Sequence, residues 1–347
     1  MSWTLSQSFL SYSSPVIKTI EMHTGGEPLR VIISGYPKIH GDTILQKRRY
    51  AKNNLDHLRK MLMFEPRGHN DMYGAVLVDT DLPGADIAVL FMHNGGYSTM
   101  CGHAIIALGR LVVDKKYVTA TEPETEVNIQ CPCGLVKTVV EYKDGKSGYV
   151  RFHSVPAFLF ASNVEIKVKG YGMMTVDISY GGAFYAFISA DVLGLDVRRS
   201  STSDLKKTAT AVSDAVKEQV KILHPGDDDL SFLYGTILTD GQDNWSADPT
   251  ANVCVFADAQ VDRSPTGSGV TARIALQHAK GFIQIGQKRI FESGVTKSLF
   301  SGTAIKQVKC NDFDAVVVEV SGQGHYTGEA SFILEEGDIV GEGFLPN

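Results

Sequence analysis

Two stretches of this sequence share one layout, a small polar turn that leads into an apolar segment with helical spacing. The first reads "STMCGHAIIALGRLV" from Ser98, and the second reads "DRSPTGSGVTARIALQHA" from Asp262. Cys101 stands at the mouth of the first predicted helix, and Thr266 stands at the mouth of the second. In both halves of the chain, strands and an amphipathic helix precede this turn. We therefore infer an internal duplication at the level of layout, which constrains the fold more than any other feature.

Apolar residues at helical spacing predict the remaining helices. The segment 44–64 is predicted to be one long amphipathic helix, and 204–223 is predicted to be another. The segments 102–113 and 268–279 follow the two turns, and the first of them is so apolar that we expect it to be buried. Most of the other segments read as short strands bounded by Gly-rich turns.

Composition limits the class of protein. A chain of 347 residues suggests two domains or one large one, and its net charge of −6 argues against a nucleic-acid partner. No apolar run is long enough to span a bilayer. The N-terminal "MSWTLSQSFLSYSSP" lacks the features of a targeting peptide, so we expect a short disordered lead-in.

The cysteines favour a reducing compartment, and we expect the cytoplasm. There are five of them, an odd and sparse count that does not fit a disulfide scaffold. The "CPC" at Cys131–Cys133 has no second Cys/His pair at zinc-like spacing, so we expect no metal site.

The two helix mouths are suited to hold a small anion. A helix N-terminus has unpaired N–H groups and a partial positive charge, and glycines beside it let a ligand approach the backbone. The same environment lowers a cysteine pKa, which makes Cys101 a candidate base or nucleophile. From the residues alone, Cys101 could also be a buried filler, Asp262 and Ser268 could be capping or turn residues, and Thr266 could merely fill space.

Four motifs together resemble the proline racemase family, in order and over nearly the whole chain. They are "HTGGEPLR" at 23–30, "EPRGHNDMYGA" at 65–75, "MCGH" at 100–103 and "DRSPTGSG" at 262–269. The resemblance implies an α+β, diaminopimelate-epimerase-like fold. Such a fold has two similar domains, each a curved, mostly antiparallel sheet around a central helix, with the active site in the cleft between them.

On this basis we expect an N-terminal domain of residues 15–160 plus 336–347, which carries Cys101. We expect residues 161–335 to form the C-terminal domain, which carries Thr266.

The resemblance also implies roles for single residues. Family members that racemise proline or epimerise hydroxyproline have cysteine at both helix mouths, whereas this chain has Thr266 at the second. That departure resembles the branch that dehydrates trans-3-hydroxy-L-proline, with Cys101 as proton acceptor. The implied substrate contacts are the backbones of Gly102, His103, Gly267 and Ser268 for the carboxylate, and the side chains of Asp262 and His103 for the ring nitrogen. The implied partner is a small imino acid, the implied assembly is a homodimer, and neither a cofactor nor a metal is implied.

The stereochemistry of that substrate explains how one thiol could suffice. The Cα proton and the 3-hydroxyl of trans-3-hydroxy-L-proline both lie opposite the carboxylate, so loss of water is a syn elimination. A base on that single face could take the proton and then return one to the departing hydroxide. No acid is needed on the other face, where Thr266 is expected.

Other readings stay open at this point. A proline racemase or 4-hydroxyproline 2-epimerase could use Cys101 with water, a non-catalytic protein could only bind proline, and diaminopimelate epimerase fits the motifs poorly. His69 and Asp71 are interpreted as a structural hydrogen-bond network. Phe184 and Tyr185 are interpreted as interdomain core, although either could contact the substrate ring.

Overall fold

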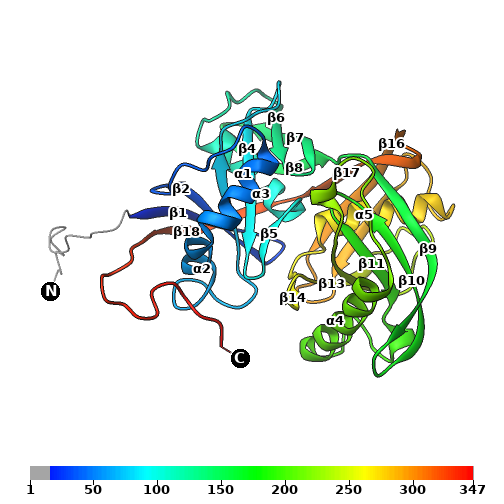
Figure 1. The fold of residues 1–347 in the computed structure, drawn as a ribbon. Coiled ribbons are helices and arrows are strands. Elements are labelled where there is room, and N and C mark those ends of the chain that lie inside the picture. Colours follow the sequence, from blue (N-terminus) through cyan, green and yellow to red (C-terminus); the bar gives the residue numbers. More distant parts are fainter. Residues whose placement is uncertain (1–15, 347) are drawn as a thin grey trace, which may run out of the picture.

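The computed structural model of this chain describes residues 16–346. The predicted lead-in, 1–15, lies outside the described residues. The described elements form two lobes side by side, blue to cyan for the first and green to orange for the second (Figure 1).

The first part of the chain forms eight strands and three helices in sequence order. They are β1 (Ile17–Thr24), β2 (Glu27–Ser34), α1 (Ile44–Asn54), α2 (Asp56–Met63), β3 (Tyr73–Val78), β4 (Ile87–His93), β5 (Gly96–Ser98), α3 (Gly102–Asp114), β6 (Glu124–Cys131), β7 (Gly134–Lys143) and β8 (Lys146–His153).

The second part forms ten strands, two α-helices and two short 3₁₀ helices. They are β9 (Ala157–Val168), β10 (Gly172–Tyr180), β11 (Phe184–Ser189), η1 (Asp191–Leu193), α4 (Thr202–Gln219), η2 (Asp228–Leu230), β12 (Leu233–Thr239), β13 (Thr250–Phe256), β14 (Gln260–Val261), α5 (Gly267–Ala279), β15 (Lys288–Ser293), β16 (Leu299–Cys310), β17 (Phe313–Gly322) and β18 (Gly324–Phe332).

Strand pairing repeats from one lobe to the other. The parallel pairs β2–β3 and β4–β6 of the first lobe correspond to β11–β12 and β13–β15 of the second. The other pairs are antiparallel, including β8–β17, which joins the strands of the two lobes into one continuous sheet. The α+β fold with two similar, mostly antiparallel halves is therefore as predicted.

A buried helix lies at the centre of each lobe. Helix α3 packs against β1, β7 and β8, and α5 packs against β9, β10, β16 and β17. Both helices are buried along most of their length, because an apolar helix without a polar face is stable only when a sheet covers it on several sides. Their N-termini point toward each other across the boundary between the lobes, where the glycines Gly102 and Gly267 are in contact.

The prediction of one long helix over 44–64 is wrong. Helix α1 ends at Asn54, the backbone of Leu55 is not helical (φ −124°, ψ 13°), and α2 starts at Asp56. Asparagines are poor interior helix residues, and Asp56 favours a helix start, where its carboxylate forms an ion pair with Arg59 at 2.6 Å. The break leaves both short helices covering one side of the first lobe (Figure 1).

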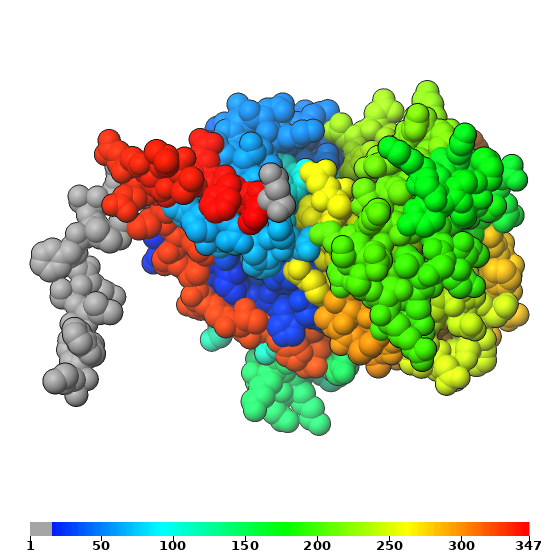
Figure 2. Space-filling view, turned by 90° about the horizontal axis from the view of Figure 1, so that it is seen from below, coloured from blue at the N-terminus to red at the C-terminus, as the bar shows by residue number. Residues whose placement is uncertain are grey.

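The C-terminal segment returns to the first lobe. Strand β18 pairs with β1, in the position that β9 has beside β10 in the second lobe. Beyond it, Phe344 forms a β-bridge with Glu65, and Arg67 donates to the carbonyls of Ile333 and Gly341. Figure 2 shows this red segment against the blue and cyan surface. The division into domains stays a proposal, and these contacts favour grouping 324–332 with the first domain.

Within the part of the chain that the structure describes, no helix combines the length and the apolar character needed to cross a membrane.

Candidate active site

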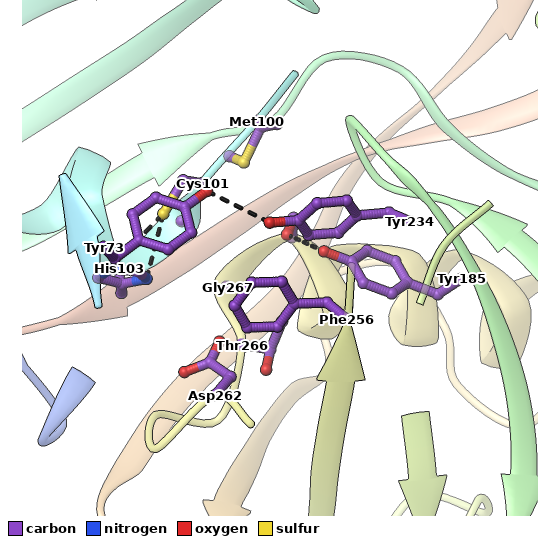
Figure 3. Close-up of a pocket in the computed structure, with 12 residues that line it drawn as sticks. Tyr73, Met100, Cys101, His103, Tyr185, Tyr234, Phe256, Asp262, Thr266 and Gly267 are labelled. Atoms are coloured by element: carbon purple, nitrogen blue, oxygen red, sulfur yellow. Dashed lines mark hydrogen bonds between the residues drawn. The ribbon is translucent and has the colours of Figure 1, made fainter. Parts of the chain in front are cut away.

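A small pocket lies where the two central helices meet, and its free volume of about 10 Å³ is no more than a single water molecule needs. All seven residues predicted from the sequence line it, and so do five others. The lining residues are Tyr73, Met100, Cys101, Gly102, His103, Tyr185, Tyr234, Phe256, Asp262, Thr266, Gly267 and Ser268. Figure 3 shows side chains of both lobes converging on this space.

Cys101 is the N-cap of α3 and has an extended backbone (φ −147°, ψ 104°), which turns its thiol to the mouth of the helix. Its Sγ lies 3.1 Å from Nδ1 of His103. The other ring nitrogen of His103, Nε2, lies 3.2 Å from the carbonyl oxygen of Pro28. A carbonyl accepts but cannot donate, so we assign the proton of His103 to Nε2. Nδ1 then accepts from the Cys101 thiol.

Protonation of this pair is governed by burial. Burial raises the pKa of the Cys101 thiol well above its usual range, against the effects of the Ala104 N–H and the Tyr73 hydroxyl. Burial likewise lowers the pKa of His103 to about 3. The helix mouth was expected to lower the cysteine pKa, but desolvation is the larger effect in this buried site. The resting pair is therefore a neutral thiol beside a neutral imidazole.

Thr266 has an unusual backbone for a β-branched residue. It is the N-cap of α5 with φ 66° and ψ 92°, in a region that bulky side chains rarely adopt. Its hydroxyl is buried and forms no hydrogen bond with a described residue. Cys254, on β13, is fully buried and does not line the pocket. Among the described lining residues, Cys101 thus carries the one thiol.

A buried pair of acidic residues borders the pocket. Asp262 accepts a hydrogen bond from the N–H of Ser264 at 2.7 Å, and burial raises the pKa of its carboxyl. Glu27 is completely buried, and burial together with the charge of Asp262 raises the pKa of Glu27 well above its usual range. Arg263 pairs with Glu27 through its Nε at 2.8 Å and its backbone N–H at 2.7 Å. Since Glu27 starts β2 and Arg263 precedes α5, this pair connects the two lobes.

Free backbone donors line both helix mouths. The main-chain hydrogen bonds of α3 start from Ile105 N–H to the Cys101 carbonyl, and those of α5 start from Val270 N–H to the Thr266 carbonyl. The N–H groups of the residues between are outside the helical ladder, as at any helix N-terminus. Two such mouths in contact make a site for one carboxylate.

Three tyrosines complete the lining, and the sequence reasoning assigned a possible role to Tyr185 alone. The Tyr185 hydroxyl lies 2.7 Å from Oγ of Ser268, at the mouth of α5. The Tyr73 hydroxyl lies 2.5 Å from Oγ of Ser98 and 3.4 Å from the hydroxyl of Tyr234. Tyr73 belongs to the "EPRGHNDMYGA" motif. The sequence interpretation singled out His69 and Asp71 of this motif, but the residue that lines the pocket is Tyr73, two positions after Asp71.

The other residues considered from the sequence lie outside the pocket. Asp71 accepts from the N–H of Val261 at 3.3 Å and pairs with Lys206 at 3.6 Å, and the ring of His69 contacts the neighbouring carbonyl of Asn70. Phe184 packs in the core of the second lobe. Among residues 16–346, no cluster of three or more His, Cys, Asp or Glu side chains is arranged to hold a metal.

Comparisons with known proteins agree with one another. The family model of proline racemases matches residues 19–345. A trans-L-3-hydroxyproline dehydratase of Xenopus tropicalis is 62% identical over 96% of each chain, and a human trans-3-hydroxy-L-proline dehydratase is 58% identical over 96% of this chain and 95% of its own. A crystal structure of a hydroxyproline epimerase from Agrobacterium vitis with bound trans-4-hydroxy-L-proline aligns with a TM-score of 0.90, at 25% identity and 97% coverage of both chains.

Proposed function

This chain belongs to the proline racemase family, and we infer that it removes water from trans-3-hydroxy-L-proline to give Δ1-pyrroline-2-carboxylate. The protein is a hydro-lyase that acts on a small imino acid. The relatives that are 58–62% identical over most of the chain carry the names of that activity. One observation in the pocket supports it further, namely a thiol at one helix mouth and an alcohol at the other.

The pair of Cys101 and Thr266 favours elimination over epimerisation. Epimerisation at Cα needs a base on one face of the ring and an acid on the other. A threonine hydroxyl does not ionise near neutral pH, whereas the reference pKa of a thiol is about 8.5. Syn elimination from trans-3-hydroxy-L-proline needs chemistry on one face alone, which Cys101 serves.

We propose that the substrate carboxylate binds between the two helix mouths. Backbone N–H groups of Gly102 and His103 on one side, and of Gly267 and Ser268 on the other, would hold it. As the Cα proton leaves, negative charge moves into the carboxylate, and preorganised donors stabilise that charge without reorganisation. The closed pocket excludes water, which strengthens this interaction.

Asp262 would bind the ring nitrogen, with His103 beside it. Their pocket position fits that role, and a cationic substrate nitrogen would draw the Asp262 carboxyl into its charged form. The same positive charge favours ionisation of the Cys101 thiol, whose pKa is raised by burial. Binding of the substrate thus prepares the base.

The reaction then proceeds on one face of the ring. The Cys101 thiolate takes the Cα proton, the electron pair forms the Cα–Cβ double bond, and the C3–O bond breaks. The hydroxide takes up a proton and leaves as water. The enamine that results tautomerises to the imine, Δ1-pyrroline-2-carboxylate.

Assembly and compartment are further parts of this proposal. We propose a homodimer, as the family resemblance implies, and gel filtration with light scattering tests it. The five cysteines are all free thiols in the described chain, which supports a reducing compartment such as the cytoplasm.

Incubation with trans-3-hydroxy-L-proline in D₂O tests the function directly. Imine trapped with o-aminobenzaldehyde, with no deuterium appearing in D-proline from a parallel L-proline reaction, is the expected result. A Cys101→Ser variant is expected to lose turnover at least about 10²-fold, the low end for a general base. Formation of α-deuterated D-proline without imine would instead make the protein a racemase.

A further inference from the structure

The leaving hydroxide needs a proton on the face where Cys101 acts. This step belongs to the function proposed above, and the inference rests on it. Cys101 alone would have to accept the Cα proton and donate it again within one event. A second protonated group beside the thiol would separate the two transfers, so the pocket wall next to Cys101 is the place to look for it.

Tyr73 has the required position. It starts β3 in the first lobe, the lobe that also carries Cys101, and its side chain is buried. Its hydroxyl is close enough to the Cys101 thiol to lower the pKa of that thiol, and its ring lies next to His103. The rings of Tyr73 and His103 meet edge to face with centroids 4.9 Å apart. With Cys101 as the base, the 3-hydroxyl of the substrate, which shares a face of the ring with the Cα proton, would lie toward the pocket wall that Cys101 and Tyr73 form.

The hydrogen-bond partners of Tyr73 leave its proton available. Its oxygen lies 2.5 Å from Ser98 Oγ and 3.4 Å from the Tyr234 hydroxyl, and each of these neighbours has a proton of its own. Tyr73 can accept from Ser98 and still donate into the pocket. Burial raises the pKa of Tyr73 well above its usual range, so the hydroxyl stays protonated in the resting enzyme.

We propose that Tyr73 is a catalytic residue that donates a proton to the departing 3-hydroxide. The thiolate of Cys101 takes the Cα proton while the Tyr73 O–H proton passes to the leaving oxygen, and water departs. The Cys101 thiol then returns its proton to the Tyr73 phenolate, which restores both groups. The net change is substrate to enamine plus water, with no external oxidant or reductant.

A Tyr73→Phe variant tests this role. General acid assistance contributes about 10²–10⁴-fold, and we expect dehydration of trans-3-hydroxy-L-proline to slow by that factor. The Tyr73 hydroxyl also favours the Cys101 thiolate, but removal of the Cα proton should slow less than loss of the hydroxide, so substrate recovered from D₂O should gain α-deuterium faster than imine forms. Imine formation within about threefold of wild type would overturn the proposal.

A substrate with a better leaving group distinguishes acid catalysis from a structural role. Chloride leaves without protonation, so the variant should lose much less of its rate in the elimination of chloride from trans-3-chloro-L-proline, after subtraction of the spontaneous reaction, than in dehydration. An equal loss on the hydroxy and chloro substrates would overturn the proposal, because it would mean that the variant has a damaged pocket.

Two further variants serve as controls. Tyr97→Phe removes another buried tyrosine hydroxyl, which donates to the Ala51 carbonyl outside the pocket, and should keep wild-type turnover. Tyr234→Phe removes the neighbouring hydroxyl. If Tyr234→Phe slowed dehydration more than chloride elimination, and Tyr73→Phe showed no such difference, the assignment of Tyr73 would be contradicted. Wild-type enzyme that forms no imine at all would overturn the proposed function and this inference with it, a result distinct from failure of Tyr73→Phe alone.

Discussion

At the scale of single residues, the alcohol of Thr266 separates this pocket from one that could act on both faces of a ring. Its backbone is held at φ 66°, which is costly for a β-branched side chain. Its hydroxyl is buried without a partner among the described residues. A cysteine side chain, which is not β-branched, would suit this backbone and this buried position at least as well. We therefore expect Thr266 to tolerate replacement by cysteine.

We predict that Thr266→Cys gives the protein epimerase activity. With thiols at both helix mouths, one face can lose the Cα proton while the other receives one. In D₂O, trans-4-hydroxy-L-proline should convert to its C2 epimer carrying α-deuterium, as followed by NMR and chiral chromatography. Thr266→Ser, which adds no thiol, should form no epimer. Absence of epimer from the cysteine variant would show that the second mouth does not face Cα.

A second residue-scale prediction concerns pH. Burial raises the pKa of Cys101, so the free enzyme is a thiol at neutral pH, and the reactive thiolate fraction grows as pH rises toward that pKa. The logarithm of kcat/KM should therefore rise with a slope approaching one between about pH 6 and pH 8, below the reference thiol pKa. A flat profile over that range would mean that the helix mouth, and not burial, determines the pKa.

At the scale of elements, the two central helices were predictable and the helix over 44–64 was predicted wrongly. Helices α3 and α5 follow turn motifs and have long apolar stretches, signals that depend on neighbours in the sequence. Leu55 is buried in the first lobe and so continues the apolar spacing, while the signals for the break are the asparagines before it and Asp56 after it. The amphipathic spacing continues through Leu55, so the spacing could not locate the break between α1 and α2.

The contact of the two helix mouths leads to an element-scale prediction. A Cβ on Gly102 would lie 2.8 Å from the carbonyl carbon of Gly267 and 2.9 Å from the N–H nitrogen of Ser268, and neither backbone atom can move freely. Gly102→Ala should raise KM for trans-3-hydroxy-L-proline at least tenfold, because α3 and α5 must separate. It should also lower the free energy of unfolding by about 1–3 kcal/mol, although alanine favours helix.

Kinetics and urea unfolding measure these two effects. Gly328→Ala is the matched control, because a Cβ at Gly328 on β18 meets no atom within 4 Å. That substitution should leave KM unchanged and stability within about 0.5 kcal/mol. If Gly102→Ala and Gly328→Ala had the same KM and the same free energy of unfolding, the N-termini of α3 and α5 could move apart without loss of substrate binding or stability.

At the scale of the whole molecule, duplication was predictable but the composition of the pocket was not. The motifs placed Cys101 and Thr266 at two mouths, and the cleft follows from the family fold. Tyr73, Tyr185 and Tyr234 are the first or second residues of three strands in different parts of the chain, and each reads locally as an ordinary strand residue. Their convergence depends on how the lobes dock, which is information that no local pattern contains.

Closure of the lobes over the pocket leads to the last prediction. The lining residues Cys101, Asp262 and Thr266 are each 5% exposed, so substrate enters when the lobes separate. Arg263 holds them together through Glu27 and through the Asp71 carbonyl, to which its Nη2 donates at 2.7 Å. Arg263→Gln removes both side-chain contacts, keeps the backbone N–H bond to Glu27, and leaves that buried carboxyl without its charged partner, which favours the open form.

The open form should expose the thiol and weaken substrate binding. We expect Arg263→Gln to react faster with iodoacetamide at Cys101, as peptide mass spectrometry measures, and to show a higher KM. Arg198→Gln removes ion pairs with Asp240 and Glu292 inside the second lobe and should change neither quantity. If alkylation of Cys101 were as slow in Arg263→Gln as in Arg198→Gln, the contact between Glu27 and Arg263 would not control access, and entry would have to depend on other contacts between the lobes.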